Sequence, residues 1–85
     1  MIKLLFQKYY QDLLDKGDYS TALSVLKKNP EILDLDPDNL EGVRSGLNRI
    51  YAQFSSHISE DLLKDGLTDV LRQVTGQSKL EFALR

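Results

Sequence analysis

The stretch that decides the fold runs Gly17-Asp18-Tyr19-Ser20-Thr21-Ala22-Leu23. Apolar residues recur every three or four positions on both sides of it, which indicates that one helix ends here and another begins. Glycine readily adopts the left-handed conformation that ends helices, and an aspartate after it is a good N-cap for the next helix. Tyr19 and Ala22 then lie three residues apart on one face of the new helix. The stretch therefore predicts the corner of a helical hairpin.

The two helices that meet at this corner are expected over residues 2–16 and 18–28. The apolar stripe of the first consists of Leu5, Phe6, Tyr9, Tyr10, Leu13 and Leu14. The second is expected to bury Tyr19, Ala22, Leu23 and Leu26. Asn29-Pro30 then breaks the pattern, because proline disfavours helical geometry in the residue before it. Since proline is well suited to a first helical position, a short helical turn through Ile32 and Leu33 should follow, and whether it extends to Leu35 is left open.

Two longer helices are expected over residues 37–56 and 59–75. Asp36-Pro37 repeats the combination of a cap and a proline, and the stripe that follows is the most regular in the chain: Leu40, Val43, Leu47, Ile50, Tyr51 and Phe54. Ser59 is the expected N-cap of the last helix and Gly76 its stop. Together these segments predict a single all-α domain over residues 1–85, built as an antiparallel four-helix bundle or as two stacked hairpins.

The segment 77–85 follows the last expected helix and alternates apolar with polar residues. Its apolar members are Leu80, Phe82 and Leu84. The pattern is compatible with an extended segment laid on the bundle, a last helical turn or a strand that binds a partner. The sequence leaves these alternatives open.

Composition and charge limit the classes of function. The 85 residues carry a formal net charge of -2, the wrong sign for a protein that binds phosphate backbones in general, so we expect no nucleic-acid partner. There is no cysteine for a disulfide or a thiolate zinc site. No apolar run is long enough for a membrane span, and the first residues lack a small-residue cleavage site. We therefore expect a soluble, cytoplasmic protein.

The residues that carry chemistry do not form a catalytic pattern. Asp34-x-Asp36-x-Asp38 is similar to the start of a calcium loop, but Asn39 stands where the loop requires glycine and Ser45 where it requires glutamate. We interpret the acidic segment 31–41 as a solvated connection. His57 is the only histidine, and a nucleophile needs a base that is held by a third group. We expect no enzyme, no cofactor and no bound metal.

Contacts with a protein partner are the remaining class of function, and the sequence leaves the oligomeric state open. Gly42 and Gly46 lie four apart on the third expected helix, where small residues allow a neighbouring helix to come close or leave a shallow groove. Tyrosine keeps one polar end when its ring is buried, which suits the rim of an interface. The candidate partner-binding residues are Tyr9, Tyr10, Arg44, Arg49, Leu80, Phe82 and Leu84.

Two resemblances make this expectation more concrete. The corner Gly17-Asp18-Tyr19 with Ala22 resembles the turn of a single tetratricopeptide-type helical hairpin. That resemblance implies a regulatory adaptor, or an inhibitor of the antitoxin kind, which binds a protein or peptide through a helical-hairpin groove.

The second resemblance covers most of the chain and is prompted by Leu47-Asn48-Arg49-Ile50-Tyr51 and by the helix from Ser59 to Leu71. The layout is similar to the enterocin A/pediocin-type bacteriocin immunity proteins, which are small four-helix bundles. The resemblance implies a protein that protects its producer cell by contacting a complex of membrane receptor and bacteriocin from the cytoplasmic side. The segment from Gln77 would then help to set specificity.

Overall fold

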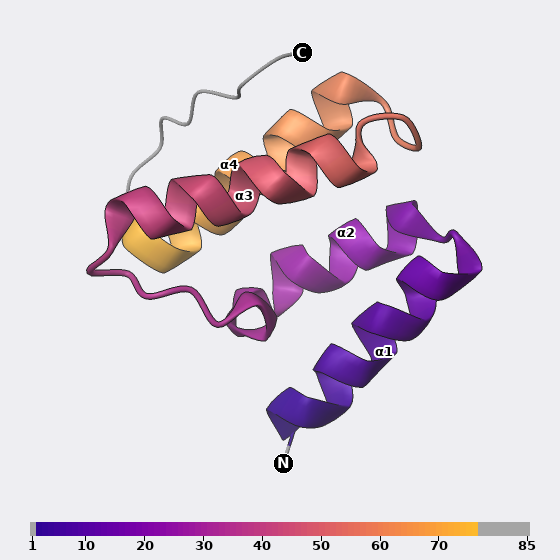
Figure 1. The fold of residues 1–85 in the computed structure, drawn as a ribbon, viewed down its shortest axis with the longest axis horizontal. Coiled ribbons are helices and arrows are strands. Elements are labelled where there is room, and N and C mark those ends of the chain that lie inside the picture. Colours follow the sequence, from indigo (N-terminus) through magenta and orange to yellow (C-terminus); the bar gives the residue numbers. More distant parts are fainter. Residues whose placement is uncertain (1, 77–85) are drawn as a thin grey trace.

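The computed structural model describes residues 2–76, with side chains from Leu4 onward. It contains α1 (Ile2–Lys16), α2 (Tyr19–Lys28), a 3-10 turn η1 (Pro30–Leu33), α3 (Leu40–Phe54) and α4 (Glu60–Thr75), and no strand occurs over this range. Figure 1 shows α1 and α2 as one hairpin and α3 and α4 as a second, and α2 packs against α4. The expectation of a small all-α protein with four helices is confirmed.

The corner between α1 and α2 has the geometry that its sequence predicts. Gly17 adopts a φ of 81°, in the left-handed region. The backbone amide of Gly17 donates to the carbonyl of Leu14 and that of Asp18 to the carbonyl of Leu13, at 3.0 and 2.9 Å. This pair of bonds defines the Schellman motif. The Asp18 carboxylate then accepts from the backbone amide of Thr21 at 3.2 Å and caps α2.

The start of α3 differs from the expectation. The helix begins at Leu40 rather than at residue 37, and it ends at Phe54 rather than at 56. Its N-cap is Asn39, whose side-chain oxygen accepts from the backbone amide of Gly42 at 3.0 Å. Asp36, the expected cap, instead accepts from the amide of Asp38 at 2.9 Å and so stabilises a turn before the helix. Asp36 and Asn39 offer the same capping chemistry. The Asp36 carboxylate is already bonded within the turn that precedes the helix, so Asn39 serves as the N-cap.

The core lies between α2, α3 and α4. The largest side chains that are fully buried are Phe54, Leu26, Leu47, Leu63, Leu67, Leu71, Val43 and Val70. At Gly66 on α4, an added Cβ would lie 3.0–3.1 Å from three atoms of the Leu23 side chain on α2. The absence of a side chain at this position therefore lets the two hairpins come close together.

The apolar stripe of α1 is narrower than expected. Only Leu13 is buried, whereas Leu5 and Tyr9 are 68% and 49% exposed. Leu4, which lies outside the expected stripe, is 62% exposed. The cause is that α1 packs chiefly against α2 and η1, so its neighbours cover only one side of it.

The junction between the hairpins is held by two glutamine side chains. Gln7 on α1 donates from Nε2 to the carbonyl oxygen of Ile32 in η1, at 2.9 Å. Gln73 on α4 donates from Nε2 to the carbonyl oxygen of Lys27 at the end of α2, at 2.7 Å. Pro30 begins the turn between these bonds, as its sequence predicts. Gln7 thereby ties η1 to α1, and Gln73 ties α4 of the second hairpin to the end of α2.

Candidate functional site

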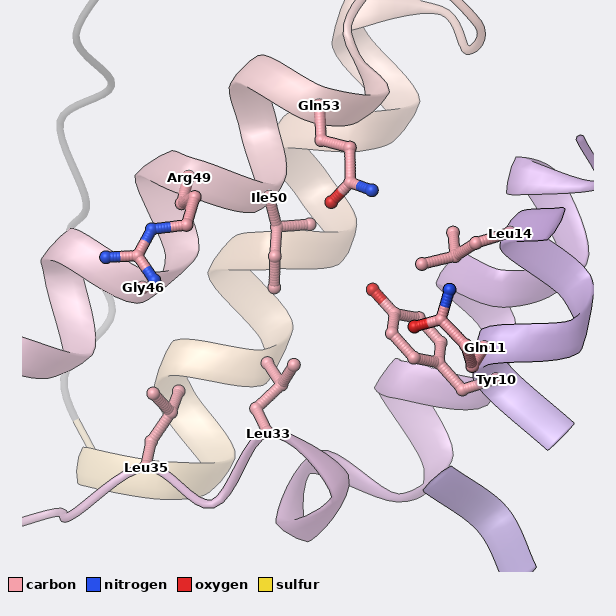
Figure 2. A pocket seen from close by; sticks show the side chains of 9 residues that line it. All are labelled: Tyr10, Gln11, Leu14, Leu33, Leu35, Gly46, Arg49, Ile50 and Gln53. Atoms are coloured by element: carbon pink, nitrogen blue, oxygen red, sulfur yellow. The ribbon is translucent and has the colours of Figure 1, made fainter. Parts of the chain in front are cut away.

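A groove of about 310 Å³ lies between the two hairpins. Its walls come from α1 on one side and α3 on the other, and its floor comes from η1 and the segment that follows (Figure 2). The lining residues are Tyr10, Gln11, Leu14, Leu33, Leu35, Gly46, Arg49, Ile50 and Gln53. The groove is thus assembled from three segments that are distant in the sequence.

The groove is apolar inside and polar at its edges. Ile50 is buried, and Leu14, Leu33 and Leu35 are half-buried. The polar members are exposed and stand at the rim: Gln11, Arg49 and Gln53. Ligand sites in proteins commonly combine an apolar lining with a few polar groups that fix orientation, and this groove has that composition.

Tyr10 provides the polar group inside the groove. Figure 2 shows its ring reaching from α1 toward Ile50 on α3. Burial raises the pKa of Tyr10 from 10.0 to about 12, and the nearby Tyr19 adds to the increase in this pKa. The phenol is therefore neutral near pH 7, where its hydroxyl both donates and accepts hydrogen bonds.

Gly46 forms part of the α3 wall. An added Cβ at this position would lie 3.0 Å from Cδ2 of Leu35, so the glycine gives the Leu35 side chain room to lie against α3. The sequence allowed two interpretations of Gly42 and Gly46: close approach of a neighbouring helix, or a shallow groove. Gly46 lies in the groove and makes room for the Leu35 side chain rather than for a neighbouring helix, whereas Gly42 lies next to the side chain of Asn39, the N-cap of α3.

The structure brings together two of the candidate residues and separates the others. Tyr10 and Arg49 both line the groove. Tyr9 and Arg44 are exposed and lie outside its lining. The remaining three candidates fall outside the described residues: Leu80, Phe82 and Leu84.

Sequence reasoning missed most of the lining. Leu14 and Ile50 carry the periodicity of core residues, and they do pack against the core as well as line the groove. Leu35 belongs to an irregular segment where no periodicity applies. The exposed Gln11 and Gln53 have the pattern of ordinary surface positions, so no sequence signal singled them out.

His57 has a structural contact just beyond the C-terminal end of α3. Its ring stacks on Tyr19 with a centroid distance of 4.0 Å and an interplanar angle of 10°. Tyr19 in turn meets Phe54 edge-on at 4.9 Å. This aromatic set ties the corner of the first hairpin to the α3–α4 connection. The hydroxyl of the neighbouring Ser55 donates to the carbonyl of Ala52 at 3.3 Å, not to the imidazole.

A polar triad joins α3 to the start of α4. The carboxylate of Glu60 accepts from the hydroxyl of Tyr51 at 2.9 Å and pairs with the ammonium of Lys64 at 3.0 Å. The bonds from Lys64 and Tyr51 lower the pKa of Glu60. Partial burial and the bond to Glu60 raise the pKa of Tyr51. The triad links the two helices of the second hairpin and lies away from the groove.

Over residues 2–76 there is no group of three or more histidine, cysteine, aspartate or glutamate side chains arranged to hold a metal ion. Within the same range, no helix has both the length and the apolar character that crossing a bilayer requires. No protein-family model matches the chain, and no curated protein or solved structure matches it. A functional proposal for this protein therefore has to start from the groove.

Proposed function

We propose that this protein is a non-enzymatic interaction module that binds an apolar segment of a protein partner in the groove between α1 and α3. The proposal rests on the composition of the groove lining. Apolar side chains from α1, η1 and α3 converge on one groove, and polar side chains border it. Protein interfaces share this organisation of an apolar centre inside a polar rim.

The shape and charge of the groove describe the segment that it would take. A volume of about 310 Å³ is at the lower end of the range for ligand pockets, roughly 300–1,000 Å³, and suits a few side chains rather than a whole helix. The Tyr10 hydroxyl can pair with a backbone group of the segment, and the Arg49 guanidinium at the rim favours an acidic residue beside it. So small a contact favours weak and reversible binding.

The test begins with affinity capture from the native host, followed by calorimetry with the purified partner. Leu35→Glu places a charge on the floor of the groove, in an irregular segment where no helix is disturbed. Leu62→Glu is the matched control, because Leu62 is 49% exposed on α4 and outside the groove. We expect Leu35→Glu to weaken binding at least about tenfold, equivalent to ~1.4 kcal/mol, while the control binds as the parent does.

Circular dichroism establishes that both variants keep their helices. A partner that binds the folded Leu35→Glu variant with unchanged affinity would rule out the groove as the binding site. Equal weakening by both variants would show that the contact is spread over the surface.

The more concrete proposal is that the protein is a bacteriocin immunity protein that acts in the cytoplasm of the producer cell. The four-helix layout supports it, together with the stretch from Leu47 to Tyr51 that suggested the resemblance. Expression in a sensitive strain tests it directly: immunity predicts survival against at least one pediocin-like bacteriocin. Unchanged killing by a full panel would remove this version and leave the interaction module standing.

The alternative is an adaptor or an antitoxin-like inhibitor. The groove supports this alternative in one respect, since its size suits a peptide. However, the walls of the groove come from α1 and α3 rather than from the α1–α2 hairpin alone. Gene neighbourhood separates the two proposals. A bacteriocin precursor gene next to this one supports immunity, whereas a toxin gene supports the inhibitor.

A further inference from the structure

We infer that the groove between α1 and α3 is also a binding site for small organic acids, whose apolar body lies against Leu35 and Ile50 while the carboxylate pairs with Arg49. The binding of such an acid does not depend on the proposed function. As a means of regulation, in which the acid competes with the apolar segment of the partner, the inference rests on that function.

Arg49 is the residue that selects this class of ligand. It is the only charged residue among the described residues that line the groove, although the whole chain has 13 acidic residues and a net charge of -2. Among residues 2–76, the Arg49 side chain forms neither an ion pair nor a hydrogen bond. Its guanidinium is therefore available to a carboxylate, which it can bind through two parallel hydrogen bonds.

The guanidinium and the apolar surface are close enough for one small molecule to contact both. Gly46, Arg49 and Ile50 occupy positions i, i+3 and i+4 of α3, where side-chain positions are neighbours, with about 5–6 Å between Cβ atoms. Leu35 packs on the Gly46 position, since an added Cβ there would lie 3.0 Å from its Cδ2. Figure 2 shows Leu35 and Arg49 at the same end of the groove, beside Gly46. An acid whose carboxylate meets Arg49 therefore has its carbon atoms against Leu35 and Ile50.

The rest of the lining contains no negative charge that would repel an acid. Its other polar members are Tyr10, Gln11 and Gln53, and burial raises the pKa of Tyr10 to about 12, so that its phenol is neutral near pH 7. The carboxylate of Asp15 accepts from Nε2 of Gln11 at 3.1 Å but lies outside the lining, on the helix across the groove from Arg49. A volume of about 310 Å³ suits a short carbon chain or a single ring rather than a long lipid tail.

Titrations followed by proton–nitrogen correlation NMR test the inference on the full chain and without any partner. The probes are hexanoate and hexanamide, which share a carbon chain and differ in the charge of the head group. We expect hexanoate to shift the amide resonances of the lining residues in a saturable way, with a dissociation constant in the millimolar range. Hexanamide should bind at least about tenfold more weakly, because it cannot form the charge-assisted pair with Arg49.

Three variants assign the effect to particular residues, with circular dichroism to establish that each keeps its helices. Arg49→Gln should reduce the affinity for hexanoate to that for hexanamide, whereas Leu35→Glu should weaken the binding of both probes. Arg44→Gln is the matched control, because Arg44 is exposed on the same helix and lies outside the lining. It should leave the preference for hexanoate unchanged.

Four results would overturn the inference: no saturable shift, shifts confined to residues outside the lining, equal affinity for the two probes, or a preference for hexanoate that survives Arg49→Gln in a folded protein. Calorimetry with the protein partner answers a separate question. If Leu35→Glu weakens partner binding but the groove does not bind hexanoate, the proposed function stands and this inference fails. If hexanoate binds as expected but the partner ignores Leu35→Glu, the inference stands and the groove is not the partner's site.

Discussion

Tyr10 is the residue whose chemistry the groove alters most clearly. Because its ring is half-buried between the hairpins and lies near Tyr19, its hydroxyl gives up a proton only at high pH, with a pKa of about 12. The folded pKa lies above the usual 10.0. The stabilisation that the neutral Tyr10 phenol gives the folded protein is therefore complete below pH 10, and it is lost as the pH rises from 10 toward 12.

Ultraviolet titration measures this ionisation. Subtracting the curve of Tyr10→Phe from that of the parent isolates Tyr10, and we expect the difference to have its midpoint near pH 12. Circular dichroism at each pH shows whether the protein is still folded. A midpoint near pH 10 in a folded protein would mean that Tyr10 is not held in the groove.

At the scale of the secondary-structure elements, the start of α3 distinguishes between two candidate N-cap residues, Asp36 and Asn39. Asn39 accepts from the amide of Gly42, whereas the Asp36 carboxylate bonds to Asp38 outside the helix. Loss of an N-cap side chain costs about 1 kcal/mol, with a usual range of roughly 0.5–2 kcal/mol. We therefore expect Asn39→Ala to lower the free energy of unfolding by about 1 kcal/mol and Asp36→Ala to lower it by less. Urea denaturation compares them, and the reverse order would place the helix start at residue 37.

The elements also show what the sequence could predict. Local chemistry was sufficient at the corner, where Gly17 and Asp18 have one plausible role each and the structure confirms both. It was insufficient at Asp36-Pro37, because two good capping residues stand three positions apart and only the conformation of the intervening turn selects between them. The exposed side of α1 was missed for another reason: periodicity reports which residues are apolar, but not how many neighbours cover them.

At the scale of the whole molecule, the contact between α2 and α4 depends on Gly66. A methyl group there would press on the buried Leu23 side chain at 3.0–3.1 Å. Overpacking costs about 1–3 kcal/mol, against a gain in helix propensity of about 1 kcal/mol for glycine to alanine. Gly66→Ala should therefore destabilise the protein by about 1 kcal/mol.

Gly46→Ala is the matched control, since the added methyl would meet only the half-buried Leu35 at the floor of the groove. Leu35 can move into the open space, so the propensity gain should leave stability unchanged or raised by up to about 1 kcal/mol. Thermal denaturation of both variants measures the difference. If Gly66→Ala proved as stable as Gly46→Ala, the packing between the hairpins would be looser than the structure indicates.

The groove could not be predicted at this scale from the sequence. Tyr10 and Arg49 were candidates for separate reasons, and nothing in their spacing indicated that they would share a site. Their meeting depends on the angle between the hairpins, which is set by contacts remote in sequence such as Gln7 with Ile32 and Gln73 with Lys27.

The origin of the groove walls has a thermodynamic consequence. α1 belongs to one hairpin and α3 to the other, so a molecule bound between them would be released when the hairpins separate. Occupancy and folding are then linked equilibria. A ligand at about one hundred times its dissociation constant would add about 2.7 kcal/mol to the free energy of unfolding. The melting temperature of this small protein would thus report whether its groove is filled, before the identity of the ligand is known.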